Sequence, residues 1–409
     1  MKKRFKEAQS RWFTPVQQLE IDACSRCQEC IQICPVVKEG FPDGAMERID
    51  AWQKLSGHVT GFFSGWRDRS KDHDLLKGIS STLARCTSCG LCGIVCESGI
   101  STASLWESMR GACMDLGFRE PVAEKNAKSI LEQKNPYEEA ITTRTSWIPA
   151  SAKIAENAEV CFFPGCTIAF RNQELGRAAL RILNNANVTF CMLGDEEFCC
   201  GSFLFRTGFE EAYADTIRGM ITALESKGVK TLLVSCAGCM KTIILDWPRI
   251  VGKPLPFRVM SFSSYIRDLI REQKIRLRYD HDIRVVYHDP CHSGRSLMHS
   301  LGKDTVFEVH RDVLTAIPGL ILIECEDNRE FSTCCGAGGG VKAEEPSLAQ
   351  SIASRKLDEI DWLNPDILAT TCPFCEKNLT DASRERGSVL KIMDVIELVD
   401  QTMEPNQDV

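Results

Sequence analysis

The sequence predicts a mixed α + α/β protein, with a helical N-terminal domain followed by two duplicated α/β domains that contain parallel sheets. The stretch between Cys34 and Cys86 has few β-branched runs, which favours helices. From residue 157, short apolar strands alternate with amphipathic helices, a pattern typical of parallel sheets. The same order of strands, helices and cysteines then occurs a second time, which indicates an internal duplication.

The chain divides into a helical domain, a connector and two α/β domains, expected at 1–120, 121–156, 157–280 and 281–409. Apolar residues at helical spacing predict a helix over 104–117. The connector is expected to lack regular structure, because Asn135-Pro136 and Trp147-Ile148-Pro149 interrupt it.

Each α/β domain is expected to alternate strands with helices. In the first domain, the pattern predicts strands at 159–166, 188–193 and 230–236, and helices at 172–186 and 208–228. In the second, it predicts strands at 283–291, 320–326 and 366–375, and a helix at 344–364. We expect the two copies to face each other about a pseudo-twofold axis.

Composition limits the function. A formal charge of −7 argues against a nucleic-acid partner, which would need a basic face. The chain has no apolar run of 18 residues and no apolar signal segment, so we expect a cytoplasmic protein. In such a chain, 22 cysteines favour metal binding or catalysis over a disulfide scaffold.

Two cysteine runs near the N-terminus have the spacing C-x2-C-x2-C-x3-C, which indicates cubane [4Fe–4S] clusters. In two-cluster ferredoxins, the fourth cysteine of each run binds the other cluster. We therefore expect one cluster on Cys24, Cys27, Cys30 and Cys96, and the other on Cys86, Cys89, Cys92 and Cys34. Structural zinc sites use pairs of C-x2-C rather than such runs.

Two longer sets each combine a lone cysteine, a Cys-Cys-Gly and a C-x-x-C: Cys166, Cys199, Cys200, Cys236 and Cys239, then Cys291, Cys334, Cys335, Cys372 and Cys375. Adjacent cysteines suit neighbouring irons of an irregular cluster better than one tetrahedral site. The strands should deliver these thiols to the carboxyl edges of the sheets. Helix N-termini expected after Cys200, Cys239, Cys335 and Cys375 would favour thiolates, and Gly201 and Gly336 would allow close backbone approach.

Taken together, these sets resemble the CCG domains of heterodisulfide reductase. Behind a two-cubane domain, they resemble its D subunit and the related K subunit of the membrane complex of sulfate reducers. The segments GLCGIVCESGI at 90–100 and HDPCH at 288–292 are typical of this family. The resemblance implies that each five-Cys set holds a non-cubane [4Fe–4S] cluster. It also implies that the two clusters flank a substrate disulfide and each deliver one electron to it.

The resemblance further implies an integral-membrane cytochrome b-type partner, with this chain peripheral to the membrane through that partner. The alternative is an electron relay, as in the related iron–sulfur subunits of glycolate, lactate and glycerol-3-phosphate dehydrogenases. The completeness of both five-Cys sets favours disulfide chemistry. The chain has no flavin or nicotinamide fingerprint, so we expect any such cofactor on a partner. The identity of the disulfide and the direction of the reaction stay open.

Other residues near the motifs have two interpretations. His288 and His292 flank Cys291 and could donate protons to a released thiolate, or only hydrogen-bond the loop. Arg295 could bind an anionic substrate or form a surface ion pair. The run Gly336–Gly340 is expected as a tight loop around a cluster. The cysteines outside the motifs are expected to be inert buried thiols: Cys113, Cys161, Cys191 and Cys325.

Overall fold

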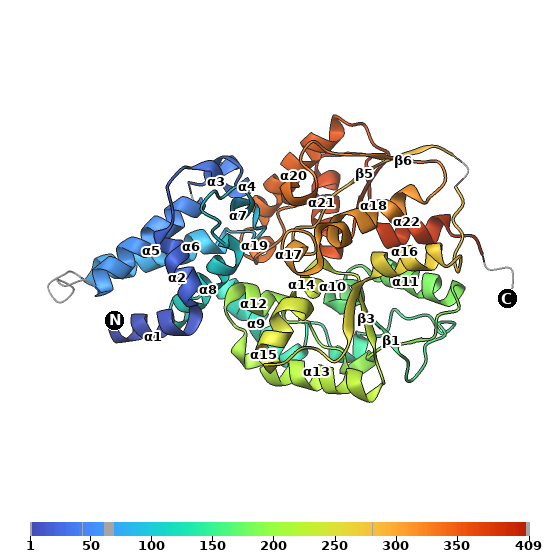
Figure 1. The fold of residues 1–409 in the computed structure, drawn as a ribbon, viewed down its shortest axis with the longest axis horizontal. Helices are drawn as coiled ribbons and strands as arrows, with labels where there is room; N and C mark the ends of the chain where they lie inside the picture. Colours follow the sequence, from blue (N-terminus) through green and yellow to red (C-terminus); the bar gives the residue numbers. More distant parts are fainter. Residues whose placement is uncertain (1, 43, 61–68, 280, 406–409) are drawn as a thin grey trace. The chain divides into compact units, whose positions relative to one another are not determined.

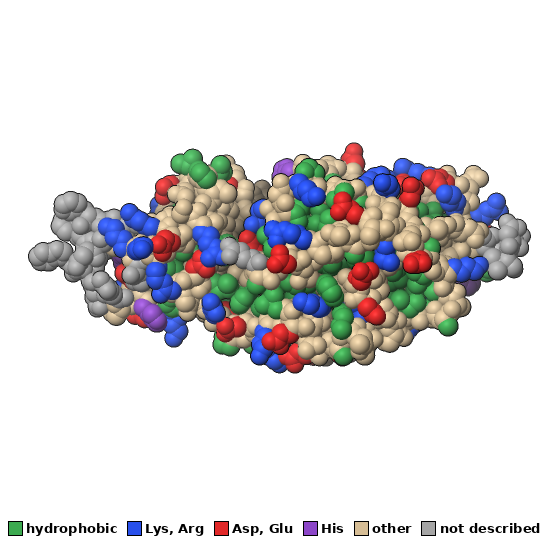
Figure 2. Space-filling view, turned by 90° about the horizontal axis from the view of Figure 1, so that it is seen from below, with side chains coloured by type: hydrophobic (Ala, Val, Ile, Leu, Met, Phe, Trp, Pro, Cys, Tyr) green, Lys and Arg blue, Asp and Glu red, His purple; other side chains and the backbone are tan. Residues whose placement is uncertain are grey.

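A computed structural model describes residues 2–42, 44–60, 69–279 and 281–405 (Figure 1). The chain forms two compact units. The first comprises Met1–Ala127, Phe203–Phe209 and Thr333–Ala353, and the second comprises Lys128–Ser202, Glu210–Ser332 and Ser354–Val409. On the face drawn in Figure 2, Lys and Arg side chains are interspersed with Asp and Glu.

The first unit is helical, as predicted. Its main helices are α1 (Lys2–Trp12), α2 (Pro15–Asp22), α5 (Ala45–Thr60), α6 (Arg69–Ala84) and α8 (Thr102–Asp115). Helix α8 is the one predicted over 104–117, and it packs against α1 and α6. Its buried face includes Trp106, which shares a core with Trp52 of α5. This core supports the cysteine loops on either side of α5 and α6.

The prediction that residues 121–156 lack regular structure is wrong for their first part. Helix α9 (Pro121–Gln133) begins at a proline, which is well tolerated at the first helical position. Its buried residues Ala123, Ala127 and Ile130 follow helical spacing. The helix ends before Asn135-Pro136, as expected for a residue that precedes proline.

The second unit contains two four-stranded sheets in which every strand pair is parallel, as predicted. The first sheet has the order β2-β1-β3-β4, formed by Phe190–Cys191, Val160–Phe163, Thr231–Val234 and Arg258–Ser261. The second has the corresponding order β6-β5-β7-β8, formed by Leu320–Ile323, Ile283–Tyr287, Ile367–Thr370 and Lys391–Asp394. The identical strand order confirms the duplication.

The fourth strand of each sheet was absent from the prediction. Strands β4 and β8 lie at the edges of their sheets and are only partly buried, so they carry no continuous apolar run. Each leads into a helix through an N-cap residue, Ser261 before α16 (Phe262–Arg271) and Asp394 before α22 (Val395–Thr402). Ser261 and Asp394 therefore occupy equivalent positions in the two copies.

The two copies pack through equivalent helices. Helix α11 (Gln173–Asn185) of the first copy packs against α22 of the second, and α16 of the first packs against α18 (Val309–Thr315) of the second (Figure 1). This reciprocal pairing is what a pseudo-twofold axis requires. One apolar core runs through both copies and includes Phe262 and Leu269 of α16 together with Val313 of α18.

Two predicted helices begin later than expected. The helix expected over 208–228 is α13 (Ala214–Ser226), preceded by a single 3₁₀ turn at Glu211–Tyr213. The helix expected over 344–364 is α20 (Pro346–Asp361). The helix expected over 172–186 agrees with α11.

Two glycines in helices differ in the space that surrounds them. A Cβ at Gly176 of α11 would lie 2.6 Å from the Trp147 ring and 2.8 Å from Ile168, whereas one at Gly219 of α13 would meet nothing within 4 Å. We expect Gly176→Ala to lower the free energy of unfolding by about 1–3 kcal/mol through overpacking. We expect Gly219→Ala to raise it by about 0.5–1 kcal/mol, because alanine favours the helix.

Denaturant unfolding of the anaerobically purified protein measures both changes. Equal effects of the two substitutions would contradict the close packing of Trp147 on α11.

Candidate metal centres

The two N-terminal cysteine runs fold into loops of the same backbone conformation. Arg26 and Gln28 in the first loop, and Ser88 and Gly90 in the second, have positive φ between 52° and 75°. Each loop leads into a single helical turn, α3 (Glu29–Gln32) or α7 (Leu91–Ile94), and these two turns contact each other. Left-handed conformations of non-glycine residues are strained, and such strain concentrates at functional sites.

Cysteines from both runs lie close together within the first unit. A cavity of about 20 Å³ is lined by Cys24, Cys27, Cys30 and Cys96, and also by Cys92. Cys34 lies with the other run instead. The pKa of the Cys34 thiol is raised to about 11, chiefly by burial, with Cys86 and Cys89 acting in the same direction and Arg48 in the opposite one.

The first long set lies entirely in the second unit. Its sulfurs form a continuous line of neighbouring thiols, from Cys166 through Cys199, Cys200 and Cys239 to Cys236. The line continues into the second set, because Cys236 contacts Cys372 and Cys372 contacts Cys375. Seven thiols thus follow one another without a gap.

The corresponding cysteines of the two sets have the same backbone surroundings. Cys236 is the N-cap of α14 (Ala237–Lys241) and Cys372 is the N-cap of α21 (Pro373–Glu385), both in extended conformation. The predicted helix starts after Cys239 and Cys375 therefore lie three residues earlier, after the first cysteine of each C-x-x-C. Gly201 and Gly336 both have φ +87°, and each donates its N–H to the sulfur two residues before it.

Two further expectations differ in detail. Strand β1 ends at Phe163, so Cys166 lies in the first turn of α10 (Gly165–Phe170) rather than at a strand end. A helix, α12 (Ser202–Thr207), follows Cys200 as expected, but the turn α19 (Val341–Glu344) begins well beyond Cys335.

The glycine run after Cys335 packs against a cubane loop within the first unit. A Cβ at Gly338 would lie 2.3 Å from the Thr87 carbonyl oxygen, and one at Gly339 would lie 2.1 Å from that of Cys86. Only glycine fits there. In the second set, Cys291, Cys372 and Cys375 belong to the second unit, whereas Cys334 and Cys335 belong to the segment that forms part of the first.

Several residues that hold the first set were not identified from the sequence. Gly165 has φ +75°, and a Cβ there would lie 3.1 Å from the Cys239 sulfur. The buried side chains of Tyr213 and Trp247 donate hydrogen bonds to the carbonyls of Cys199 and Cys200, at 2.7 and 3.0 Å. None of these residues belongs to a cysteine motif, so their roles depend on contacts distant in sequence.

The most unexpected neighbour of the thiols is Arg144, from the predicted connector. Its side chain is 2% exposed, with Nη1 3.6 Å from Cys166 Sγ and Nη2 2.5 Å from Glu197 Oε1. Glu197 also accepts the Gly165 N–H at 3.0 Å, so the carboxylate is fixed from two sides. Burial lowers the pKa of Arg144, but Glu197 and Cys166 raise it by more, so the guanidinium stays charged beside the sulfur.

The histidines near Cys291 are buried. Burial lowers the pKa of His288 to about 3, which keeps this imidazole neutral at neutral pH. Arg295 is 5% exposed, so the surface ion pair considered for it is wrong. Its Nη1 donates to the carbonyls of Glu330 and Ser332, at 3.0 and 2.6 Å, which braces the loop before Cys334. The four cysteines outside the motifs are buried, as expected.

These donor sets fit iron. Burial raises the pKa of Cys30 and Cys34 to about 11, so water alone would leave these thiols protonated. A bound metal deprotonates coordinating thiols, and thiolates are the usual ligands of iron–sulfur clusters. All 22 cysteines lie in the described residues, and none of them forms a disulfide there.

Comparisons with known proteins agree with this chemistry. Residues 20–100 match the 4Fe-4S dicluster domain, and residues 160–244 and 285–380 each match the cysteine-rich domain CCG. The chain is 36% identical to the D subunit of the dihydromethanophenazine:CoB–CoM heterodisulfide reductase of Methanosarcina barkeri, over 98% of this chain and 99% of the relative. The chain belongs to the family of heterodisulfide reductase D subunits.

Two other similarities are more distant. The B subunit of the fumarate reductase (CoM/CoB) of Methanothermobacter marburgensis is 30% identical over 93% of this chain and 72% of its own length. A crystal structure of a hypothetical protein from Helicobacter pylori has a TM-score of 0.55 and 10% identity, covering 98% of this chain and 74% of that one, which shows the fold alone. As a family member, the chain is an iron–sulfur oxidoreductase. In its described residues, no helix is long and apolar enough to cross a membrane.

For iron bound through Cys166, we expect Arg144 to raise the midpoint potential, because a cation that donates to a ligand sulfur stabilises the more negative, reduced state. Arg144→Met should lower that potential by about 60 mV or more, the one-electron equivalent of about 1.4 kcal/mol. Glu197→Gln should raise it, because it removes the compensating negative charge. EPR-monitored redox titration measures both shifts.

Arg181→Met is the matched control, because Arg181 pairs with Asp400 and Glu174 on the surface of the same unit. Arg144 would have no electrostatic role if its variant and the control gave the same potential.

Proposed function

We propose that this chain carries two cubane and two non-cubane [4Fe–4S] clusters and reduces or forms a disulfide of the heterodisulfide type. The cubanes would bind Cys24, Cys27, Cys30 and Cys96, and Cys86, Cys89, Cys92 and Cys34. The non-cubane clusters would bind the two five-Cys sets. The observation that carries the proposal is the unbroken line of thiols that joins the two long sets through Cys236 and Cys372.

The reaction consumes electrons and protons together: R–S–S–R′ + 2 e⁻ + 2 H⁺ gives RSH and R′SH. The clusters supply one-electron transfer when bound. The chain's own residues position the sulfur ligands and exclude water from them. Cys199 and Cys200 are held by Tyr213 and Trp247, and Arg144 adds positive charge beside Cys166. An electron on the first set would therefore be stabilised by a fixed cation in a dry environment.

The proposal assigns residues 1–120 to electron entry and residues 157–280 and 281–409 to the two halves of the disulfide site, with 121–156 joining them. The electron donor would be an integral-membrane cytochrome b-type protein, so this chain would be peripheral to the membrane and cytoplasmic. The similarity to a reductase component whose name includes dihydromethanophenazine supports such a donor.

Iron content and EPR test the proposal on anaerobically purified protein. Four clusters correspond to about 16 Fe per chain. We expect that amount, together with a new paramagnetic signal that develops only when a thiol is added under oxidising conditions, because substrate sulfur would then bind at the long sets. About 8 Fe per chain, or no thiol-dependent signal, would favour the electron relay instead.

Single cysteine variants localise the signal. Cys372→Ser should abolish the thiol-dependent signal and leave the cubane signals intact, because Cys372 lies where the two long sets meet. Cys325→Ser is the control, since Cys325 is equally buried but lies outside every motif. A thiol-dependent signal that survives in Cys372→Ser would show that the disulfide binds elsewhere.

A further inference from the structure

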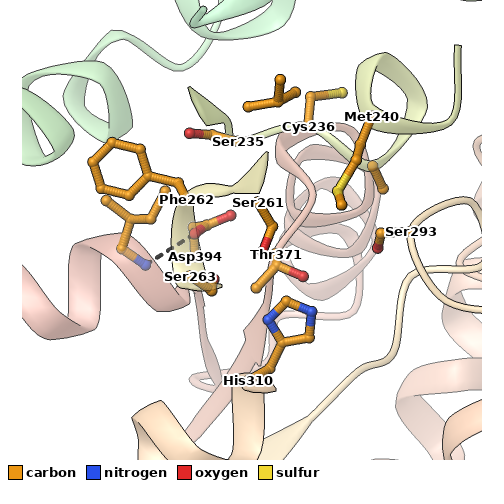
Figure 3. Close-up of a pocket in the computed structure, with 13 residues that line it drawn as sticks. Ser235, Cys236, Met240, Ser261, Phe262, Ser263, Ser293, His310, Thr371 and Asp394 are labelled. Atoms are coloured by element: carbon orange, nitrogen blue, oxygen red, sulfur yellow. Dashed lines mark hydrogen bonds between the residues drawn. The ribbon is translucent and has the colours of Figure 1, made fainter. Parts of the chain in front are cut away.

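A small cavity with both polar and apolar lining residues lies where the two copies meet within the second unit, next to Cys236 (Figure 3). It measures about 10 Å³, which is room for about one water molecule. The first copy contributes Ser235, Ser261 and Ser263, and the second contributes His310, Thr371 and Asp394. In the view of Figure 3, Ser261, Thr371 and Asp394 lie between Cys236 and His310.

Three residues that line this cavity each carry a buried side-chain atom with no hydrogen-bond partner among the described residues. These atoms are Ser235 Oγ, His310 Nδ1 and Asp394 Oδ2. Their side chains are 5%, 2% and 0% exposed. Buried polar atoms in native proteins almost always have partners, and where the protein supplies none, ordered water does so. Three such residues around one water-sized space are therefore consistent with a bound water molecule.

Asp394 has one carboxyl oxygen more than helix capping requires. Its Oδ1 accepts the Ile396 N–H at 2.9 Å and so caps α22, while Oδ2 is left for the cavity. At the equivalent position of the first copy, Ser261 caps α16 in the same way, accepting the Ser264 N–H at 3.0 Å. A serine hydroxyl is therefore sufficient as a cap, so capping alone does not explain a fully buried carboxyl at position 394.

The charges around Asp394 favour its protonated form. Burial raises the pKa of this carboxyl well above its ordinary value, and the neighbouring acidic groups of Glu397 and Cys372 act in the same direction. The Ile396 N–H opposes them. From α21, Glu376 adds a further acid that is hydrogen-bonded to Glu397. These influences favour the protonated form of Asp394, which lies near enough to Cys372 to be affected by its charge.

His310 differs from Asp394, because its ring is neutral rather than an imidazolium acid at neutral pH. Its pKa is lowered to about 4, chiefly by burial, with Arg311 and Arg267 acting in the same direction and Asp289 in the opposite one. The neutral ring stacks near Tyr287, with ring centroids 5.4 Å apart. Its unpartnered Nδ1 can hydrogen-bond a water molecule and orient it toward the carboxyl.

We propose that this cavity holds water and that Asp394 delivers protons through it to the thiolates formed beside Cys236 and Cys372. The proposal rests on the proposed disulfide reduction. As the S–S bond breaks, two electrons arrive from the one-electron donor that reduces the chain, and two S–H bonds form. Each proton leaves the Asp394 O–H for a thiolate sulfur through the cavity water, and the carboxylate recovers a proton from solvent.

A single-turnover experiment tests this route. The holoprotein is reduced with reduced benzyl viologen and mixed with the mixed disulfide of coenzyme M and coenzyme B in the presence of a pH-indicator dye. We expect Asp394→Asn and Asp394→Ser, which both keep a capping side chain, to slow proton uptake at least about tenfold. The EPR signals of the reduced clusters should be unchanged.

Asp400→Asn is the matched control on the same helix, because Asp400 pairs with the exposed Arg181 at 2.6 Å and does not line the cavity. Proton uptake at the wild-type rate in both Asp394 variants would overturn the proton route. A wild-type protein that releases no thiol would overturn the proposed function instead, so the two failures are distinguishable.

Infrared spectroscopy gives a readout independent of turnover. The as-purified holoprotein should show a carboxylic-acid C=O band that shifts in D₂O and is lost in Asp394→Asn. If the Asp394 variants do not fold, Ser263→Val tests the same route, because it places methyl groups in the cavity without altering the carboxyl. Proton uptake should slow in Ser263→Val, and an unchanged rate, or the absence of the infrared band from the wild type, would overturn the proposal.

Discussion

The structure depends on one constraint: many thiols are buried in contact with one another, and burial opposes their ionisation. Seven sulfurs follow each other from Cys166 to Cys375. A thiolate in such surroundings needs positive charge nearby, which iron supplies when bound. The protein contributes the rest of the site: glycines that make room for sulfur, aromatic donors that hold the carbonyls of Cys199 and Cys200, and Arg144 beside Cys166.

The fold meets this constraint through parallel sheets. All strands of a parallel sheet end at the same edge, so cysteines that follow different strands meet there although they are far apart in sequence. Because the fold is duplicated, the two C-x-x-C motifs have the same backbone conformation. Cys236 and Cys372 are both extended N-cap residues of the helix that follows. Because α11 packs on α22 and α16 on α18, the two C-x-x-C loops come into contact within one unit.

The sequence predicted the fold class well, because the alternation of strands and helices is a local pattern that occurs twice. It did not predict β4 and β8, since half-exposed edge strands carry little apolar signal. Nor did it indicate Arg144, which belongs to a segment interpreted as a connector. An arginine near a threonine and a serine has no local feature that distinguishes a buried ligand-sulfur contact from a surface charge. Such contacts form only when the chain folds. The position of Asp394 beside the cavity likewise depends on the tertiary fold.

A duplicated fold need not produce two equivalent halves. In the first copy, a guanidinium donates to the sulfur of Cys166, and the cap before α16 is a neutral serine. In the second copy, the corresponding cap is a buried aspartic acid near Cys372, and burial raises its pKa. The first half therefore favours added negative charge, whereas the second contains a carboxyl whose protonated form is favoured. A disulfide with two different sulfurs could then lie between two unlike halves, one of which stabilises added electrons and the other of which donates protons. In that case, the two S–H bonds would not form at the same time.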